Sequence, residues 1–454
     1  MPRDSFVVTP EGWLSRGEAY VPGDGQQLAV FGGIPGEAAR VRIFSRQGHQ
    51  ARGRAISPAG APSPDRVAPP CDKWGPCGGC PWMHLSPAGR SRAHDQLWID
   101  AARLAGANLL LSPVHLAEMG NNSELKVEWD YSDHGQPRLG VSAREGAGTV
   151  AIPRCAKVQD GVRTFMGAVA ATLKEANVPP GRDGPLRGIR GRVSRGEILV
   201  IVRLPRPVPA LAEWAGNLAS NITELRGVVT VFPPESDPKG FGQQRLYGYD
   251  WIPVDLAGAE LRLGAEDAWP RDLVAYDAML RAAPEILGVE QGDAVLEMGT
   301  GVGARLLVLS RASGWALGVE SDDKLADRAT ANLRDNNAPA EVVVDGWVEA
   351  VERVSPRLEG RRPLLWVDCG RKELGQRAVD VLRGLDPRRV ALEGNNPAAV
   401  CREVARWQRD GWTLARFERF ESDAHAPYTQ AVAVMASPNQ AAPEKRAPRR
   451  RAVR

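Results

Sequence analysis

The strongest pattern of apolar and polar positions lies in the C-terminal half of the chain. Short apolar runs typical of buried strands recur there, with stretches of helical spacing between them. The runs are DAVLEM, WALGVE, AEVVV, PLLWVD and RRVALEG, followed by WTLARFERF and QAVAVMA. This alternation predicts an α/β domain with a doubly wound, mostly parallel sheet that ends in an antiparallel pair.

A different pattern occupies the N-terminal part, where short alternating runs are separated by glycine. In ARVRIFS, Val41 and Ile43 fall on one face of an expected strand, and Arg40 and Arg42 fall on the other. Residues 6–56 as a whole therefore predict a small five-stranded β-barrel.

Between these parts, the Pro/Ser-rich stretch SPAGAPSPD predicts a linker. A helix is expected at residues 88–107, and strands alternating with loops are expected at residues 121–255. The expected domains are a β-barrel (1–60), a central α+β domain (61–260), a Rossmann-like domain (261–436) and a disordered tail (437–454).

Charge is concentrated in two segments. The net charge is +3, but residues 445–454 carry six Lys or Arg and no acid, so the remaining chain sums to −3. A second basic stretch, residues 38–64, contains no Asp or Glu and carries Arg40, Arg42, Arg46, Arg52 and Arg54. Both stretches suit attraction to phosphate, although for the second a merely solvated strand face is an equal alternative.

Three of the six cysteines stand together in CDKWGPCGGCPW, as Cys71, Cys77 and Cys80. The chain opens without an apolar leader, so we expect a cytoplasmic protein, in which disulfides are disfavoured. A single CxxC fits zinc poorly, whereas an iron-sulfur cluster needs a fourth thiolate, for which Cys155 is the best candidate. We rank the cluster first, zinc second and an accidental grouping of reduced thiols third. Cys369 and Cys401 lie in apolar surroundings and predict buried free thiols.

A glycine-rich turn predicts a cofactor site in the C-terminal half. Gly299, Gly301 and Gly303 separate an expected strand, which carries Glu297 near its end, from a helix. Glu320 closes the next strand, where a carboxylate can accept both hydroxyls of a ribose. These features fit NAD or S-adenosylmethionine; the antiparallel final pair and Asp345 after the third strand favour S-adenosylmethionine.

From Phe6 to Met435 the chain resembles the RNA (uracil-5-)methyltransferases that carry an N-terminal TRAM barrel, an iron-sulfur cluster and an S-adenosylmethionine domain. The motifs that carry the resemblance are SPDRVAPPCDKWGPCGGCPWMHL, IPRCAKVQ, VLEMGTGVG, GVESDDKLADRATANLRDNN and NNPAAVCREVARWQRDGWTLARFERF. The resemblance implies that a structural 4Fe-4S cluster is bound by Cys71, Cys77, Cys80 and Cys155. It also implies S-adenosylmethionine binding by Glu297, Gly299, Gly301, Gly303, Glu320, Asp345 and Asp368.

The chain departs from this family where the chemistry takes place. Family members add a cysteine thiolate to uracil C6, and the cysteine of their Ser-Cys-Asn-Pro motif is replaced here by Asn395. The carboxylate that removes the C5 proton is replaced by Gln430, although His425 of that motif remains. An amide serves neither as a nucleophile nor as a base at neutral pH.

Two further motifs are altered. Asp-Pro-Pro-Arg is replaced by Asp368-Cys369-Gly370-Arg371, and the Phe-x-Gln-x-Asn segment is AWPRD, with Pro270 and Asp272 at its polar positions. Neither Cys369 nor Cys401 is expected to replace the missing thiolate.

Three hypotheses remain, in decreasing order. The protein is a methyltransferase that acts on an RNA atom needing no covalent catalysis, with Asp368, Asn395 or Asn396 orienting the target. Alternatively, it is a catalytically inactive RNA-binding relative, or it still makes 5-methyluridine in a rearranged site. The expected partner is structured RNA, ribosomal rather than transfer RNA, bound by a monomer that has no association with membranes.

Overall fold

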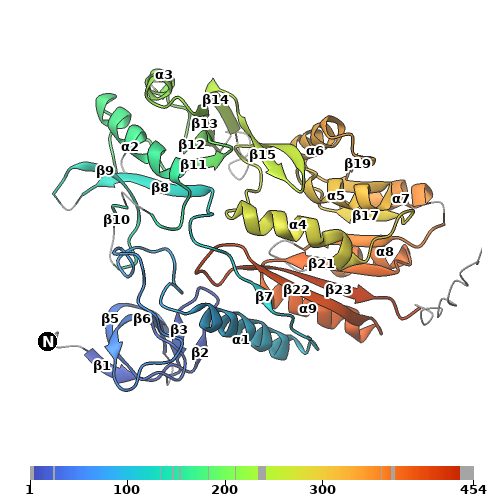
Figure 1. Cartoon of the computed structure of the whole chain (residues 1–454), viewed down its shortest axis with the longest axis horizontal. Coiled ribbons are helices and arrows are strands. Elements are labelled where there is room, and N and C mark those ends of the chain that lie inside the picture. Colours follow the sequence, from blue (N-terminus) through green and yellow to red (C-terminus); the bar gives the residue numbers. More distant parts are fainter. Residues whose placement is uncertain are drawn as a thin grey trace, which may run out of the picture.

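The computed structural model describes residues 5–23, 26–132, 134–145, 148–152, 155–181, 184–209, 211–233, 242–358, 360–369 and 374–439. Within this part of the chain, the strands form sheets of six, seven and eight strands and one two-stranded hairpin. Figure 1 shows the N-terminal sheet, the central sheet and the C-terminal sheet in separate regions of the molecule. Gly370, Arg371 and residues 440–454 of the basic tail lie outside the described residues.

The N-terminal sheet has the strand order β1-β5-β6-β4-β3-β2, with β4 and β6 parallel. Its strands are β1 (Ser5–Val8), β2 (Gly12–Trp13), β3 (Ala19–Val21), β4 (Gln27–Phe31), β5 (Ala39–Gln47) and β6 (Gln50–Pro58). The sequence pattern predicts five strands, whereas six are described, because a turn at Gly17, with φ of +85°, separates β2 from β3. Positive φ of this kind favours glycine.

The central sheet has the order β10-β9-β8-β11-β12-β13-β14. Its strands are β8 (Glu124–Tyr131), β9 (Pro137–Ser142), β10 (Thr149–Val150), β11 (Gly188–Ser194), β12 (Glu197–Arg203), β13 (Leu225–Phe232) and β14 (Gly242–Gly248). Helices α2 (Asp160–Glu175) and α3 (Leu211–Asn221) bury their apolar sides against one face of it. The hairpin of β15 (Trp251–Leu256) and β16 (Ala259–Gly264) packs against apolar residues of the other face.

The C-terminal sheet has the order β19-β18-β17-β20-β21-β23-β22-β7. Its strands are β7 (Val114–His115), β17 (Val295–Met298), β18 (Ala316–Glu320), β19 (Ala340–Val344), β20 (Leu364–Asp368), β21 (Arg389–Gly394), β22 (Thr413–Glu421) and β23 (Thr429–Ala436). The five strands from β19 to β21 are parallel, and β23 is antiparallel to both β21 and β22. The predicted parallel sheet with an antiparallel final pair is therefore confirmed.

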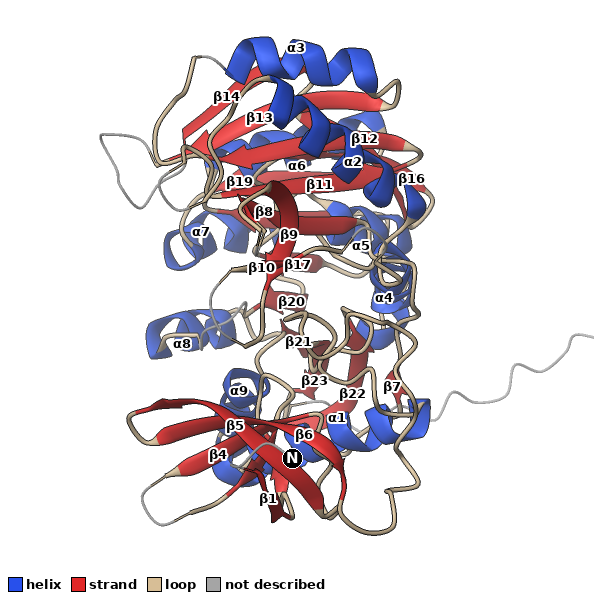
Figure 2. Ribbon diagram, turned by 90° about the vertical axis from the view of Figure 1, so that its left-hand side faces the viewer, coloured by secondary structure: helices blue, strands red, loops and turns tan. Residues whose placement is uncertain are grey.

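Helices cover both faces of this sheet, and each covered face forms its own apolar core (Figure 2). One face carries α4 (Leu273–Leu287), α5 (Ala304–Ser313) and α6 (Asp323–Asp335). The other carries α1 (Pro87–Ala105), α7 (Trp347–Val354), α8 (Gln376–Gly384) and α9 (Pro397–Arg409), with a 3-10 turn at Ser355–Leu358 after α7. Such two-sided coverage explains the nearly continuous apolar runs of the parallel strands.

Helix α1 begins where the sequence pattern predicts a helix, and it joins the N-terminal sheet to the C-terminal one. Ser86 caps it, accepting a hydrogen bond from the Gly89 amide at 3.0 Å. Trp98 donates to Thr429 Oγ1 at 3.0 Å, and Arg90 pairs with buried Glu421 at 2.7 Å. Among the described helices, none is both long and apolar enough to cross a bilayer.

Candidate active site

The glycine turn lies between β17 and α5, as predicted. Gly299, Gly301 and Gly303 have φ values of +83°, +55° and +86°, which side chains with a Cβ adopt only at a cost. A Cβ on Gly303 would lie 3.2 Å from the Ala329 backbone, so this glycine also allows α5 to approach α6 closely. The three glycines thus bring the main chain to the carboxyl ends of the strands, at the N-terminus of α5.

Glu320, at the end of β18, is bound to this turn. Its Oε2 accepts a hydrogen bond from the Gly301 amide at 2.8 Å, and its Oε1 accepts from the Ser321 and Asp322 amides at 2.8 and 3.0 Å. A carboxylate has about four acceptor sites, so Glu320 can still accept a hydrogen bond from a ribose hydroxyl while it is held by these three amides.

Two further predicted cofactor residues lie at neighbouring strand ends. Asp345 follows β19; it accepts from the Gly346 amide at 2.9 Å and pairs with Arg353 at 3.0 Å. Asp368 ends β20, and a Cβ on Gly299 would lie 3.3 Å from both the Asp368 Cβ and the Trp347 ring. The structure therefore brings the glycine turn, Glu320, Asp345 and Asp368 to one edge of the sheet.

Glu297 is also on β17, but it points to the interior. It is fully buried and pairs with Arg305 of α5 at 2.7 Å, while Arg305 pairs on its other side with Glu393 at the end of β21. Glu393 also accepts a hydrogen bond from Trp366 Nε1 at 2.6 Å. Burial raises the pKa of Glu297 to about 8 and raises the pKa of Glu393, while Arg305 lowers both.

Of the two altered catalytic positions, Gln430 contacts this buried group and Asn395 lies two residues beyond Glu393. Gln430 donates from Nε2 to Glu393 Oε1 at 2.7 Å, so its amide nitrogen is already engaged. Asn395 follows β21 and is exposed, and the register pairs Gly394 with Ala431, which places Asn395 and Gln430 at the same strand ends. That these two positions take part in one site remains a prediction.

Residues near the remaining altered motifs have structural partners. Asp272 caps α4 by accepting from the Ala275 amide at 2.9 Å. His425 has a φ of +59°, and its carbonyl accepts from the Trp82 amide at 2.9 Å, which ties the loop before β23 to the cysteine-bearing segment. Burial lowers the pKa of His425, so the imidazole is neutral at neutral pH.

The thiols of Cys369 and Cys401 are both buried, as expected. Burial raises the pKa of Cys401 to about 12 and raises that of Cys369 well above its usual value. Both thiols are therefore protonated at neutral pH and unsuited to nucleophilic attack.

Cys71, Cys77, Cys80 and Cys155 are all partly exposed and interact electrostatically as neighbours. Burial raises the pKa of Cys80 to about 12 and raises that of Cys77, whose Sγ accepts from the Gly79 amide at 3.4 Å. Among the described side chains, however, no three Cys, His, Asp or Glu residues are grouped closely enough to hold a metal ion. The cluster expected from the sequence thus remains a prediction.

The basic face of the N-terminal sheet has a local partner that the sequence pattern does not reveal. Arg42 and Arg54 are cross-strand neighbours, and both pair with Glu145, at 2.8 and 3.2 Å. Two of the arginines expected to contact RNA therefore anchor this sheet to the central part of the chain.

The buried partners of the site, Arg305, Glu393 and Trp366, were missed by sequence reasoning. Arg305 and Glu393 lie 88 positions apart, and each taken alone follows no motif. The only available signal was the presence of charged residues within otherwise apolar runs, in GARLLVL and RRVALEG.

No family model matches the chain. It is 24% identical over 461 residues to the 23S rRNA (uracil(1939)-C(5))-methyltransferase RlmD of Alkalilimnicola ehrlichii, covering 96% of this chain and 97% of the relative. It is 26% identical over 411 residues to the RlmD protein of Acidithiobacillus ferrooxidans, covering 86% and 87%. An uncharacterized RNA methyltransferase of Nostoc sp. is 23% identical over 417 residues, with 89% of each chain covered.

Among solved structures, the tRNA (uracil-54, C5)-methyltransferase of Pyrococcus abyssi, in complex with S-adenosyl-L-homocysteine, superposes with a TM-score of 0.71 at 16% identity. The match covers 95% of this chain and 100% of that one. The chain therefore has the fold of an S-adenosylmethionine-dependent methyltransferase along nearly its whole length, and its relatives support the resemblance to the RNA uracil-C5 methyltransferases.

Proposed function

We propose that the protein is an S-adenosylmethionine-dependent methyltransferase of structured RNA, acting as a monomer on ribosomal RNA, at an atom other than uracil C5. The observation that carries the proposal is the retained cofactor geometry. Glu320 is bound to the Gly301 amide at 2.8 Å, at the strand ends where Asp345 and Asp368 also lie. The relatives named as rRNA methyltransferases support RNA as the substrate.

The altered positions support a different target atom. Uracil C5 becomes nucleophilic only after a thiolate adds to C6, and Asn395 has no thiol. The amide of Gln430 donates to Glu393 and has no proton-accepting capacity at neutral pH. A ring nitrogen or a hydroxyl carries its own lone pair, so it needs neither group. We assign to Asp368 and exposed Asn395 the role of orienting such a target through hydrogen bonds.

We include a structural 4Fe-4S cluster in the proposal, bound by Cys71, Cys77, Cys80 and Cys155. Four neighbouring thiols and the amide of Gly79, which donates to a sulfur at 3.4 Å, suit a cluster chemically. Cluster binding requires these side chains to move closer together, since the described geometry forms no metal-holding group. When bound, the cluster would fix the segment beside the loop of His425 and take no part in methyl transfer.

The position of Trp347 distinguishes this function from a second one, RNA binding without methyl transfer. The indole of Trp347 packs beside Gly299 and Asp368, on the turn where a cofactor would rest. In that position the ring either stacks on a bound adenine or excludes it. The relation of Trp347 to the cofactor therefore separates the two functions.

Calorimetric titration with S-adenosylmethionine tests the cofactor directly, and absence of binding would eliminate the methyltransferase. Trp347→Ala is the informative variant: its cofactor affinity falls if the indole stacks on adenine and rises if the indole blocks the site.

Incubation with labelled methyl donor and total RNA from a strain lacking the protein then identifies the product by mass. Label in a nucleoside other than 5-methyluridine supports the proposal, and label in 5-methyluridine contradicts it. RNA binding without any label favours the second function.

A further inference from the structure

A small hollow lies on the central sheet, away from the glycine turn. It has about 60 Å³ of free volume, roughly four times the space that one buried water needs. Its lining residues are Lys126, Gly188, Arg190, Ile201, Arg203, Val231 and Glu266, and we name it the basic pocket.

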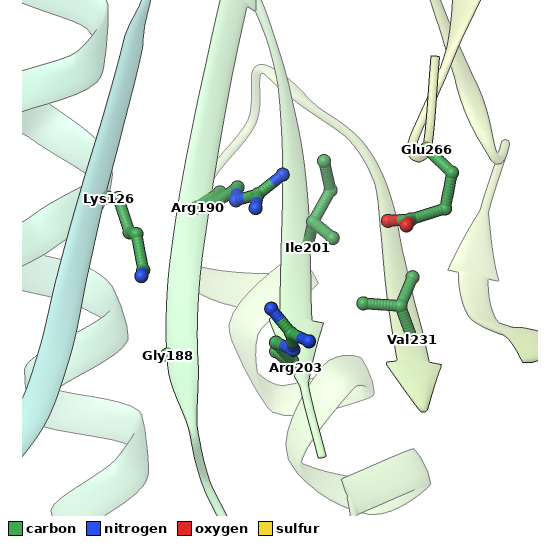
Figure 3. A pocket seen from close by; sticks show the side chains of 7 residues that line it. All are labelled: Lys126, Gly188, Arg190, Ile201, Arg203, Val231 and Glu266. Carbon is green, nitrogen blue, oxygen red and sulfur yellow. The ribbon is translucent and has the colours of Figure 1, made fainter. Parts of the chain in front are cut away.

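The strand register explains why these side chains converge. Arg190 on β11 is paired with Lys126 on β8 and with Ile201 on β12, while Gly188 is paired with Arg203. Directly paired residues point to the same face of a sheet, so the three basic residues project from one face. Figure 3 shows their side chains around a common space, with the Glu266 carboxylate entering from the opposite side.

This face is elsewhere an apolar core. Leu199, Ile201, Val229 and Val231 lie on it and pack against the hairpin of β15 and β16. Arg192, on the same face, is used structurally: it pairs with Glu124 at 2.9 Å and donates to the Gly264 carbonyl at 2.7 Å. Lys126 and Arg190 have no comparable partner: neither makes a hydrogen bond or ion pair with any described residue, and within the pocket the Glu266 carboxylate interacts electrostatically with Arg190. These two cations beside one carboxylate, that of Glu266, leave an excess of positive charge.

The pocket is connected to the candidate active site by a short segment. Glu266 begins the loop that leads to α4, and Trp269 in this loop donates to Ser123 Oγ at 2.9 Å, just before β8. Arg271 then pairs at 2.9 Å with Asp423, in the loop that precedes β23 and Gln430. An anion held in the pocket would therefore lie next to residues 266–271, the segment that connects the central sheet with the candidate active site.

We propose that the basic pocket binds one phosphate group of the RNA backbone through Lys126, Arg190 and Arg203. A phosphate offers several acceptor oxygens to a convergent set of donors, and its size suits the free volume. Gly188 keeps the space open, since it places no side chain between Lys126 and Arg203. The proposal rests on the proposed function only in taking RNA as the partner.

Glu266 provides a test with the opposite sign. Its carboxylate interacts electrostatically with Arg190, Arg192 and Arg203, and for Arg190 and Arg203 it competes with phosphate. Glu266→Gln should therefore tighten RNA binding severalfold, whereas Glu213→Gln, the same charge change on exposed α3, should leave it unchanged. An unchanged affinity in Glu266→Gln overturns the proposal, even if the variants described next do not fold.

The main experiment measures the affinity for a structured rRNA transcript at several salt concentrations. Lys126→Gln/Arg190→Gln should bind about tenfold more weakly, and the slope of log affinity against log salt should flatten by about 0.7 to 0.9, as for one lost phosphate contact. The matched control is Arg163→Gln/Lys174→Gln, which removes two charges from α2 on the other face of the sheet. Equal affinities and slopes in the two double variants overturn the proposal.

Two further measurements separate the sources of phosphate and the two proposals. Titration with inorganic phosphate and with a nucleoside monophosphate shows whether a free anion is the ligand. Loss of free-anion binding in Lys126→Gln/Arg190→Gln, with RNA affinity retained, would overturn backbone binding. Titration with S-adenosylmethionine tests the proposed function independently of the pocket. If the protein binds RNA through the pocket but does not bind S-adenosylmethionine, the proposed function is refuted and the pocket proposal stands.

Discussion

Replacement of Glu297 by glutamine would remove one of the two carboxylates that flank buried Arg305. Burial raises the pKa of Glu297 to about 8, and the neighbouring Glu393 adds to that effect while Arg305 opposes it. One guanidinium between two carboxylates neutralises only one of them. We therefore expect Glu297 to retain its proton in the folded protein at pH 6.5.

The pKa displacement predicts the direction and size of a pH effect on stability. Between pH 4.5, the ordinary pKa of the group, and about 8, the folded state binds one more proton than the unfolded state. The free energy of unfolding then falls as pH rises, by about 1.4 kcal/mol per pH unit for this one group. Over the whole window the loss is about 5 kcal/mol, and Glu297→Gln should not show it.

The assay is the number of protons released on unfolding at pH 6.5, measured by calorimetry in buffers of different ionisation enthalpy. The wild-type protein should release about one proton more than Glu297→Gln, because Glu297 ionises once it reaches water. Glu213→Gln on α3 serves as the control, since this side chain is exposed and lies away from Arg305. The count does not require unfolding to be two-state, which suits a chain with several sheets.

Equal proton release from the wild-type protein and Glu297→Gln would refute this reasoning. It would mean that Arg305 keeps both carboxylates ionised in the interior. The stability of Glu297→Gln, measured relative to wild type, would then be independent of pH between 5.5 and 8.

Three other outcomes are expected. Glu320→Gln should weaken S-adenosylmethionine binding about tenfold, corresponding to about 1.4 kcal/mol. The control Glu341→Gln, at an exposed position of β19, should keep wild-type affinity. Both affinities are measured by calorimetry, and equal affinities of Glu320→Gln and the wild-type protein would rule out ribose binding by Glu320. Anaerobically purified protein should contain iron and labile sulfide. The variant Cys77→Ser/Cys80→Ser should lose both, and the control Cys369→Ser should keep both. Stoichiometric zinc without sulfide would contradict the cluster. RNA containing 5-fluorouridine should form no covalent adduct with the protein on a denaturing gel, since Asn395 has no thiolate and Cys401 is buried and protonated; an adduct would restore the C5 mechanism.

Local signals in the sequence were sufficient for the C-terminal sheet and its glycine turn. The apolar runs are long enough to mark each parallel strand, and the spacing of Gly299, Gly301 and Gly303 places a turn before a helix. Glu320, Asp345 and Asp368 could be placed because the carboxyl ends of parallel strands meet at one edge.

Interactions between distant positions were beyond these signals. The pairing of Glu145 with Arg42 and Arg54 joins two parts of the chain that each satisfy their own local pattern. The contact between Gln430 and Glu393 depends on the register of β21 against β23, which no periodicity determines. The two-residue strand β7 is too short to show any alternation.

Strand β7 and helix α1 have a consequence for the order in which the chain can fold during synthesis. Both are translated early, yet β7 pairs with β22, and Arg90 and Trp98 bind Glu421 and Thr429, more than 300 positions later. Until the ribosome has made those residues, the C-terminal half of α1, with Trp98 and Ala102, lacks the C-terminal core that it packs into and stays open to chaperones. A nascent chain arrested before residue 413 should therefore remain protease-sensitive at residues 98–115 even after its N-terminal sheet has formed.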